Sequence, residues 1–290
     1  MWALVFIAPI LFSVNSAALK QFSLKCDNRS GGNLVFSLLY FAISTIIALV
    51  FALIIGVNSV ESMIFGLVYG VLFYGFVTLY SNSMKEGPLS YTAFIFSISM
   101  IIPITLSIIL YKESVSIFQI IGLVLIIVAL YLINFANQHS KKSVFTKKWI
   151  ILCVVGAIFN GLLLFVSKYY SMSVENGNLG QFLFVGYLTC ALLCIPRFAF
   201  PDVRETLATY KFNWWVIVLA LIVGIVNVVG NGMVSFLGKT VGGAILFPVT
   251  NGFSVVMSII ISRFFFHEEL RGRALAGMCV GVLAVVLLSL

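Results

Sequence analysis

The chain has 290 residues, of which 62% are apolar and 9% are charged, and its formal net charge is +8. Charged residues make up about a quarter of an ordinary soluble chain, so this composition excludes a soluble globular protein and indicates that the solvent is lipid. The apolar runs are continuous rather than alternating, which excludes a β-barrel and predicts an all-α integral membrane protein.

Ten apolar runs come close to the ~20 residues that a helix needs to cross a bilayer. The first run could be mistaken for a secretory signal, but the basic residues that open such a signal are missing from Met1-Trp2-Ala3, and we expect it to be a span. In chain order the predicted spans are 2–19, 34–56, 63–82, 89–111, 115–135, 149–171, 179–200, 213–237, 243–266 and 272–290.

Two stretches repeat each other at an ungapped offset of 155 positions. Residues 111–133 and 266–288 each hold a short hinge with a glutamate and then an apolar run; Glu113, Gly122 and Ala129 align with Glu268, Gly277 and Ala284. We therefore predict a duplicated unit. The first five-helix repeat would cover residues 1–136, a basic connecting loop residues 137–148, and the second five-helix repeat residues 149–290.

The odd number of helices in each half determines how the two halves are oriented in the membrane relative to each other. The second half must enter the membrane from the opposite side, so the predicted fold is ten transmembrane helices arranged as two inverted five-helix repeats. Such an arrangement is typical of transporters, because two inverted halves can exchange conformations to open one side or the other.

The basic residues predict which side faces the cytoplasm. Fourteen of the 17 Lys and Arg residues fall in odd-numbered connections, and only Lys112, Lys168 and Lys239 fall in even-numbered ones. Positive charge accumulates on the cytoplasmic side, so this bias predicts that both termini lie outside. We expect the plasma (inner) membrane as the location.

Ten helices in two halves, each ending in a glutamate hinge and a glycine-containing helix, resemble the drug/metabolite transporter superfamily and, within it, the EamA-type ten-helix carriers. The resemblance rests on Tyr111-Lys112-Glu113 with Gly122, on Phe266-His267-Glu268 with Gly277, and on the Lys-aromatic endings Lys20-Gln21-Phe22 and Lys168-Tyr169-Tyr170. It implies a central cavity between helices 1, 3, 4 and 6, 8, 9. It also implies cytoplasmic termini, which disagrees with the charge bias.

Polar residues inside apolar spans are candidates for a binding site, because placing a polar side chain in lipid costs more free energy than placing leucine at the same depth. Asparagines of helix 8 lie one turn apart on one face, and helices 1, 6 and 9 each add another. Interhelical hydrogen bonding for the amides and packing for the tyrosines stay open as alternatives. The predicted substrate-binding residues are Asn15, Tyr74, Tyr91, Asn160, Asn227, Asn231 and Asn251.

No Asp or Glu is expected in the middle of any predicted span. Glu113 and Glu268 are predicted to cap the first turns of the helices that follow them, and no Lys or Arg is expected deep enough to meet a phosphate. With no carboxylate or histidine at depth, the sequence favours neither an enzyme, a metal site nor a cofactor, and the basic connections need no nucleic acid. A GxxxxGK[ST] motif is also missing.

The sequence therefore predicts a secondary transporter of small polar, neutral or zwitterionic metabolites such as amino acids, working by alternating access. One alternative is a carrier of choline-like quaternary amines with an aromatic cage, and another is a non-transporting membrane receptor or assembly protein. The expected partners are a small-molecule substrate and the lipid bilayer. The spacings Gly66xxxGly70 and Gly277xxxGly281 predict tight helix contacts and leave a homodimer open.

Overall fold

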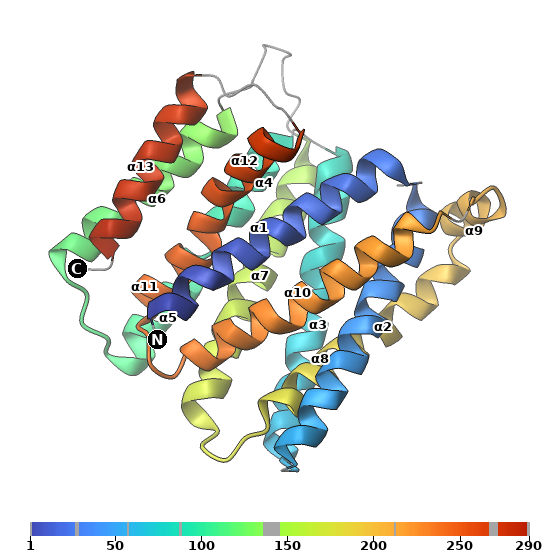
Figure 1. Cartoon of the computed structure of the whole chain (residues 1–290), viewed down its shortest axis with the longest axis horizontal. Coiled ribbons are helices and arrows are strands. Elements are labelled where there is room, and N and C mark those ends of the chain that lie inside the picture. The colour runs from blue at the N-terminus through green and yellow to red at the C-terminus, as the bar shows by residue number, and fades with distance from the viewer. Residues whose placement is uncertain are drawn as a thin grey trace.

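The computed structural model describes residues 2–26, 29–56, 58–86, 89–135, 146–211, 213–266 and 272–288, and within these ranges the chain is helical with no strand (Figure 1). In the first half the helices are α1 (Trp2–Lys25), α2 (Ser30–Ile55), α3 (Val60–Glu86), α4 (Leu89–Ile98), α5 (Ile101–Tyr111) and α6 (Ile117–Phe135). In the second half they are α7 (Lys147–Ser173), α8 (Leu179–Cys194), η1 (Ile195–Ala199), α9 (Pro201–Ala208), α10 (Trp215–Leu237), α11 (Gly243–Phe247), η2 (Pro248–Gly252), α12 (Phe253–Phe266) and α13 (Gly272–Leu288).

Seven stretches of the described chain are long and apolar enough, by length and composition, to cross a membrane. Three shorter apolar helices cover Ile117–Ile133, Gly243–Met257 and Leu275–Leu288. The chain is therefore an all-helical, multi-pass membrane protein, as predicted. The count of ten crossings stays a prediction.

Two spans that the sequence predicts as continuous helices are interrupted. Residues 89–111 divide into α4 and α5 around a turn at Ser99 and Met100, because Pro103 lacks the N–H that would bond to the carbonyl of Ser99. Residues 243–266 contain the π-helical segment η2, which begins at Pro248. Both interruptions lie beside the cavity described below.

The helices that carry the predicted asparagines converge at the centre of the bundle (Figure 1). α1 packs against α10 and α12, α3 packs against both α7 and α8, and α2 packs along α8. α6 and α13 pack along each other at one side of the molecule. This arrangement leaves α1, α3, α4, α7, α10 and α12 around the middle.

The small-residue motifs make contacts within the chain. A Cβ added to Gly66 or Gly70 of α3 would collide with the carbonyl of Phe182 or of Gly186 in α8. A Cβ at Gly277 of α13 would press on the carbonyl of Ala129 in α6. The predicted tight helix contacts are confirmed, and because these glycines are used inside one chain they give no support for a dimer.

Candidate functional site

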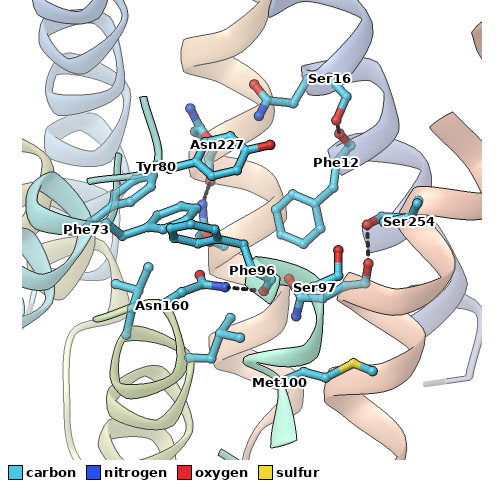
Figure 2. A pocket seen from close by; sticks show the side chains of 17 residues that line it. Phe12, Ser16, Phe73, Tyr80, Phe96, Ser97, Met100, Asn160, Asn227 and Ser254 are labelled. Atoms are coloured by element: carbon cyan, nitrogen blue, oxygen red, sulfur yellow. Dashed lines mark hydrogen bonds between the residues drawn. The ribbon is translucent and has the colours of Figure 1, made fainter. Parts of the chain in front are cut away.

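A central cavity of about 300 Å³ lies between α1, α3, α4, α7, α10 and the η2–α12 segment (Figure 2). A cavity of this size is at the lower end of the range of small-molecule sites and suits a small metabolite. The described side chains that line the cavity include amides, hydroxyls and aromatic rings, and none of them is charged.

Five of the seven predicted site residues come together at this cavity: Asn15 from α1, Asn160 from α7, Asn227 and Asn231 from α10, and Asn251 from η2. They come from four separate helical segments spread over most of the chain. An amide group costs free energy in an apolar bundle unless it is hydrogen-bonded, so five amides around one space need a physical reason.

The two predicted tyrosines, Tyr74 and Tyr91, are not among the described residues that line this cavity. Tyr74 is one residue, or 100° of helix rotation, away from Phe73, so it points away from the cavity and toward α2. It lines a separate pocket of about 40 Å³ with Arg197 and Cys194. Tyr74 is therefore not among the residues that line the central cavity, and its role in binding stays a prediction. Tyr91 belongs to α4, but its side chain lies outside the described part of the structure.

The Asn160 side chain donates hydrogen bonds at the break between α4 and α5. Its Nδ2 donates to the carbonyl of Phe96 at 3.3 Å and to Oγ of Ser99 at 2.7 Å. Ser99 in turn donates to the carbonyl of Phe96 at 2.6 Å. A carbonyl released by a broken helix needs a donor in lipid, and these two side chains supply it.

Asn231 and Asn227 lie one turn apart on α10. The Nδ2 of Asn231 donates to the carbonyl of Asn227 at 2.9 Å and to the hydroxyl of Tyr187 in α8 at 3.1 Å. The Tyr187 hydroxyl donates to the same Asn227 carbonyl at 2.9 Å. Tyr187 is fully buried, so this hydroxyl has to be bonded inside the protein, and it ties α8 to the cavity wall of α10.

Asn251 sits in the π-helical segment that begins at Pro248. Its Nδ2 lies 3.5 Å from the carbonyl of Phe247 and 3.3 Å from Oγ1 of Thr250. Thr250 is buried and donates to the carbonyl of Leu246 at 2.6 Å. π-helical turns are rare and occur frequently at functional sites, because they turn one residue out of the regular register.

A continuous aromatic wall from α3 and α4 closes one side of the cavity (Figure 2). The ring centroid of Phe76 lies 6.3 Å from that of Phe73, 5.9 Å from that of Tyr80 and 5.8 Å from that of Phe96, and Tyr80 and Phe96 meet edge to face at 4.8 Å. The sequence analysis missed Phe76, Tyr80 and Phe96. For Phe76 and Tyr80 the signal was their spacing from Phe73 on α3, which places all three on one helix face.

A buried ion pair lies near one end of the cavity. Nζ of Lys168 in α7 is 2.5 Å from Oε1 of Glu113, and the Lys168 side chain is 1% exposed. Lys168 also donates to the carbonyl of Val241 at 3.0 Å. The other carboxylate oxygen of Glu113 accepts from the backbone N–H of Gly243, at the start of α11, at 2.6 Å.

Two expectations are corrected by this pair. Lys168 does not lie in a connection between helices but is buried within α7, one turn beyond the cavity residue Leu164. Glu113 does not cap α6; there Ser116 and Gln119 cap each other, while Glu113 caps α11 instead. Glu268 lies outside the described residues. The overlooked signal was that Lys168 falls inside the predicted span 149–171.

Between the ion pair and the cavity the interior is apolar and closed. Ile104, Leu237 and Phe247 are 5%, 0% and 0% exposed, and they pack in one cluster with the cavity residues Met100 and Leu164. Figure 2 shows Met100 at the end of the cavity opposite to Ser16. The passage from the cavity toward Glu113 is therefore blocked in this conformation.

Comparison with known proteins gives a family and a fold. The model of the EamA-like transporter family matches residues 1–135 and residues 147–290. A solved structure, described only as "Crystal structure of protein", is similar to this chain with a TM-score of 0.76, covering 99% of this chain and 97% of that chain at 12% sequence identity. At that identity the likeness shows the fold alone. No curated protein matches the chain.

Proposed function

The chain belongs to the EamA-like transporter family, and from that premise we propose that it is a secondary carrier of small polar, neutral or zwitterionic metabolites such as amino acids. The observation that carries the proposal is a central cavity lined by five asparagines, with no charged side chain among its described lining residues. Amides can hold polar ligands in an apolar bundle, whereas a bare ion would lose its hydration there without a counter-charge.

We propose that the chain crosses the membrane ten times, as two inverted five-helix repeats. In this assignment residues 1–136 form the first repeat, residues 137–148 the connecting loop and residues 149–290 the second repeat, with α4–α5 as one crossing and α11–η2–α12 as another. The match of the family model in two segments, divided near residue 140, supports this division. So does the occurrence of one broken helix in each half.

Alternating access would use the contacts that the first repeat makes with the two ends of α7. Lys148 pairs with Glu86 at 2.5 Å at one end, and Lys168 pairs with Glu113 at 2.5 Å at the other, about 30 Å away along the helix. The Glu113 end is closed by the apolar layer around Leu237. Opening that end would require Lys168 to leave Glu113, whose repeat would move relative to α7.

The quaternary-amine carrier stays a second candidate, because the aromatic wall of Phe73, Phe76, Tyr80 and Phe96 could hold such a cation by cation–π attraction. A receptor or assembly role has no comparable observation in its favour, and the chain belongs to a family of transporters.

A thermal-shift screen of the detergent-purified protein tests the carrier proposal first. A ligand that binds the folded state raises the apparent unfolding temperature by mass action, so amino acids or other neutral polar metabolites should do so at millimolar concentration. The ligand found should then cross the membrane of proteoliposomes faster with the protein than without it. A ligand that stabilises the protein but does not cross would instead support the receptor.

We also propose plasma-membrane insertion with both termini outside. With Lys168 assigned to α7, the basic residues number fourteen in odd connections against two in even ones, from 17 in the chain. An alkaline phosphatase fused to the C-terminus should therefore be active in the periplasm of a bacterial host. An inactive phosphatase together with a fluorescent green-fluorescent-protein fusion at the same site would reverse the orientation.

A further inference from the structure

A second, smaller pocket lies outside the central cavity, at the end of the bundle where α2 begins and α8 ends. It has a volume of about 40 Å³ and is bounded by α2, α3 and the α8–η1 segment. Phe41 of its wall meets Phe73 of the central cavity edge to face, with the two ring centroids 5.8 Å apart. The two spaces therefore have separate linings, and the proposed carrier function makes no use of the smaller one.

The polar side chains around this pocket can donate hydrogen bonds, and one of them is positively charged. Arg197 contributes a guanidinium group, which carries five N–H donors and no acceptor. The other oxygen- and nitrogen-bearing side chains are five hydroxyls and one amide, from Ser30, Asn33, Ser37, Tyr74, Thr78 and Ser81. No carboxylate is found among the described residues of this lining, so the pocket favours an anion.

The guanidinium of Arg197 has no counter-charge of its own within the part of the chain that the structure describes. Arg197 is half-buried, and no ion pair between described residues includes it. In the pocket it lies beside the neutral hydroxyl of Tyr74. Removing a charge from water costs free energy unless the charge is paired. A bound anion would give Arg197 that charged partner.

Two hydroxyls of the pocket are not used by the described structure. Serine in a helix often donates to a carbonyl of the preceding turn, as Ser83 does to the carbonyl of Tyr80 at 2.8 Å. Ser81, two residues earlier on α3, makes no side-chain hydrogen bond to a described residue, and neither does Ser30, the first residue of α2. Because α2 begins at Ser30, the positive end of its helix dipole also lies at the pocket.

Basic side chains surround this end of the molecule. The Gly31 N–H of α2 donates to Oγ1 of Thr206 in α9 at 2.7 Å, so α9 lies against the start of α2. Exposed basic residues of α9 and of the neighbouring helix ends outnumber the acidic ones among the described residues: Lys25, Arg29, Arg204 and Lys211 against Asp202 and Glu205. The resulting positive field concentrates anions near the pocket.

We propose that this pocket binds a phosphate group through Arg197 and the surrounding hydroxyls. A phosphate group has several acceptor oxygens, and two of them can accept parallel N–H bonds from one guanidinium. A carboxylate has only two oxygens and would use fewer of the donors that α2, α3 and η1 bring to one small space. The group can belong to a soluble phosphoester or to a phospholipid head group, since both present the same oxygens.

The test follows thermal unfolding of the detergent-purified full chain in sodium phosphate and in glycerol 3-phosphate, against sodium chloride at equal ionic strength. Both phosphate compounds should raise the unfolding temperature more than sodium chloride does. Arg197→Gln should raise the phosphate dissociation constant by about 10-fold or more, since it removes a hydrogen bond between charged groups. Arg204→Gln is the matched control and should leave the constant unchanged, because Arg204 is exposed on α9 and is not among the lining residues.

Native mass spectrometry distinguishes the two sources of the phosphate group. Retention of phosphatidylglycerol by the unmodified protein, but not by Arg197→Gln, would assign the pocket to a lipid head group. Binding of glycerol 3-phosphate without retained lipid would assign it to a soluble ligand. If Arg197→Gln does not fold, Ser81→Ala makes the same test and should weaken binding by about 10-fold. Equal binding by the variant and the unmodified protein, or binding of neither phosphate source, would overturn the proposal.

Discussion

Asn231→Leu is expected to reduce flux of the ligand found in the thermal-shift screen into proteoliposomes by about 10-fold, since it removes an amide that can hydrogen-bond a polar ligand in an apolar bundle. Leucine has the same branched skeleton of four side-chain heavy atoms, so the shape of the side chain changes little. The substitution also leaves the Tyr187 hydroxyl its bond to the Asn227 carbonyl at 2.9 Å, so that the buried hydroxyl is not orphaned. The loss should therefore be one of recognition rather than of folding.

Asn58→Leu is the matched control, because Asn58 is exposed in the connection between α2 and α3 and is not among the lining residues. Its flux should equal that of the unmodified protein. Insertion of both variants is checked by their yield in the membrane and by a single peak in size-exclusion chromatography. Unchanged flux in Asn231→Leu, with both checks passed, would remove α10 from the binding site.

The second large effect concerns stability at the closed end of the cavity. Lys168→Met should lower the free energy of unfolding by about 3–5 kcal/mol, as expected when one partner of a buried ion pair is removed and the other charge stays. Glu113 is then left with only the Gly243 N–H as a partner among the described residues, in a setting where its side chain is 17% exposed. Titration of the purified protein with SDS in mixed micelles measures the change.

Two variants decide whether the unpaired charge is the cause. In Glu113→Gln/Lys168→Met no charge is left behind, and the glutamine oxygen can still accept from Gly243, so most of the lost stability should return. Lys148→Met at the other end of α7 breaks a pair whose lysine is 69% exposed, and it should cost less than about 1 kcal/mol. Equal losses in Lys168→Met and Lys148→Met would show that the buried pair has no special role.

Residue chemistry alone was enough to find most of the polar lining. An asparagine in an apolar span needs a hydrogen-bonding or binding role, so the sequence alone marks each such residue as a candidate. The structure brings all five of them to one cavity: Asn15, Asn160, Asn227, Asn231 and Asn251. Their role in binding stays a prediction. Composition could not tell whether Tyr74 faces the cavity or α2, because aromatic residues are common on every face of a membrane helix.

The ion pair between Lys168 and Glu113 was not predicted from the sequence, for a different reason. Lys168 near the end of an apolar run looks like a lysine at the membrane surface, and Glu113 before an apolar run looks like a helix cap. Only the packing of α7 against the α10–α11 connection shows that both are enclosed together. Glycine spacing likewise predicted close helix contacts, while the partner helices, α8 for Gly70 and α6 for Gly277, came from the tertiary structure.

The amino-acid sequence by itself determined that this protein is helical, lies in a membrane and is internally duplicated. These properties follow from hydropathy and spacing, which are local along the chain. The direction in which each amide points was decided only by the tertiary structure, because it depends on hydroxyls and carbonyls that other helices bring within about 3 Å. The same holds for the burial of Lys168 and the closure of one end of the cavity, which arise where segments distant in the chain pack against each other.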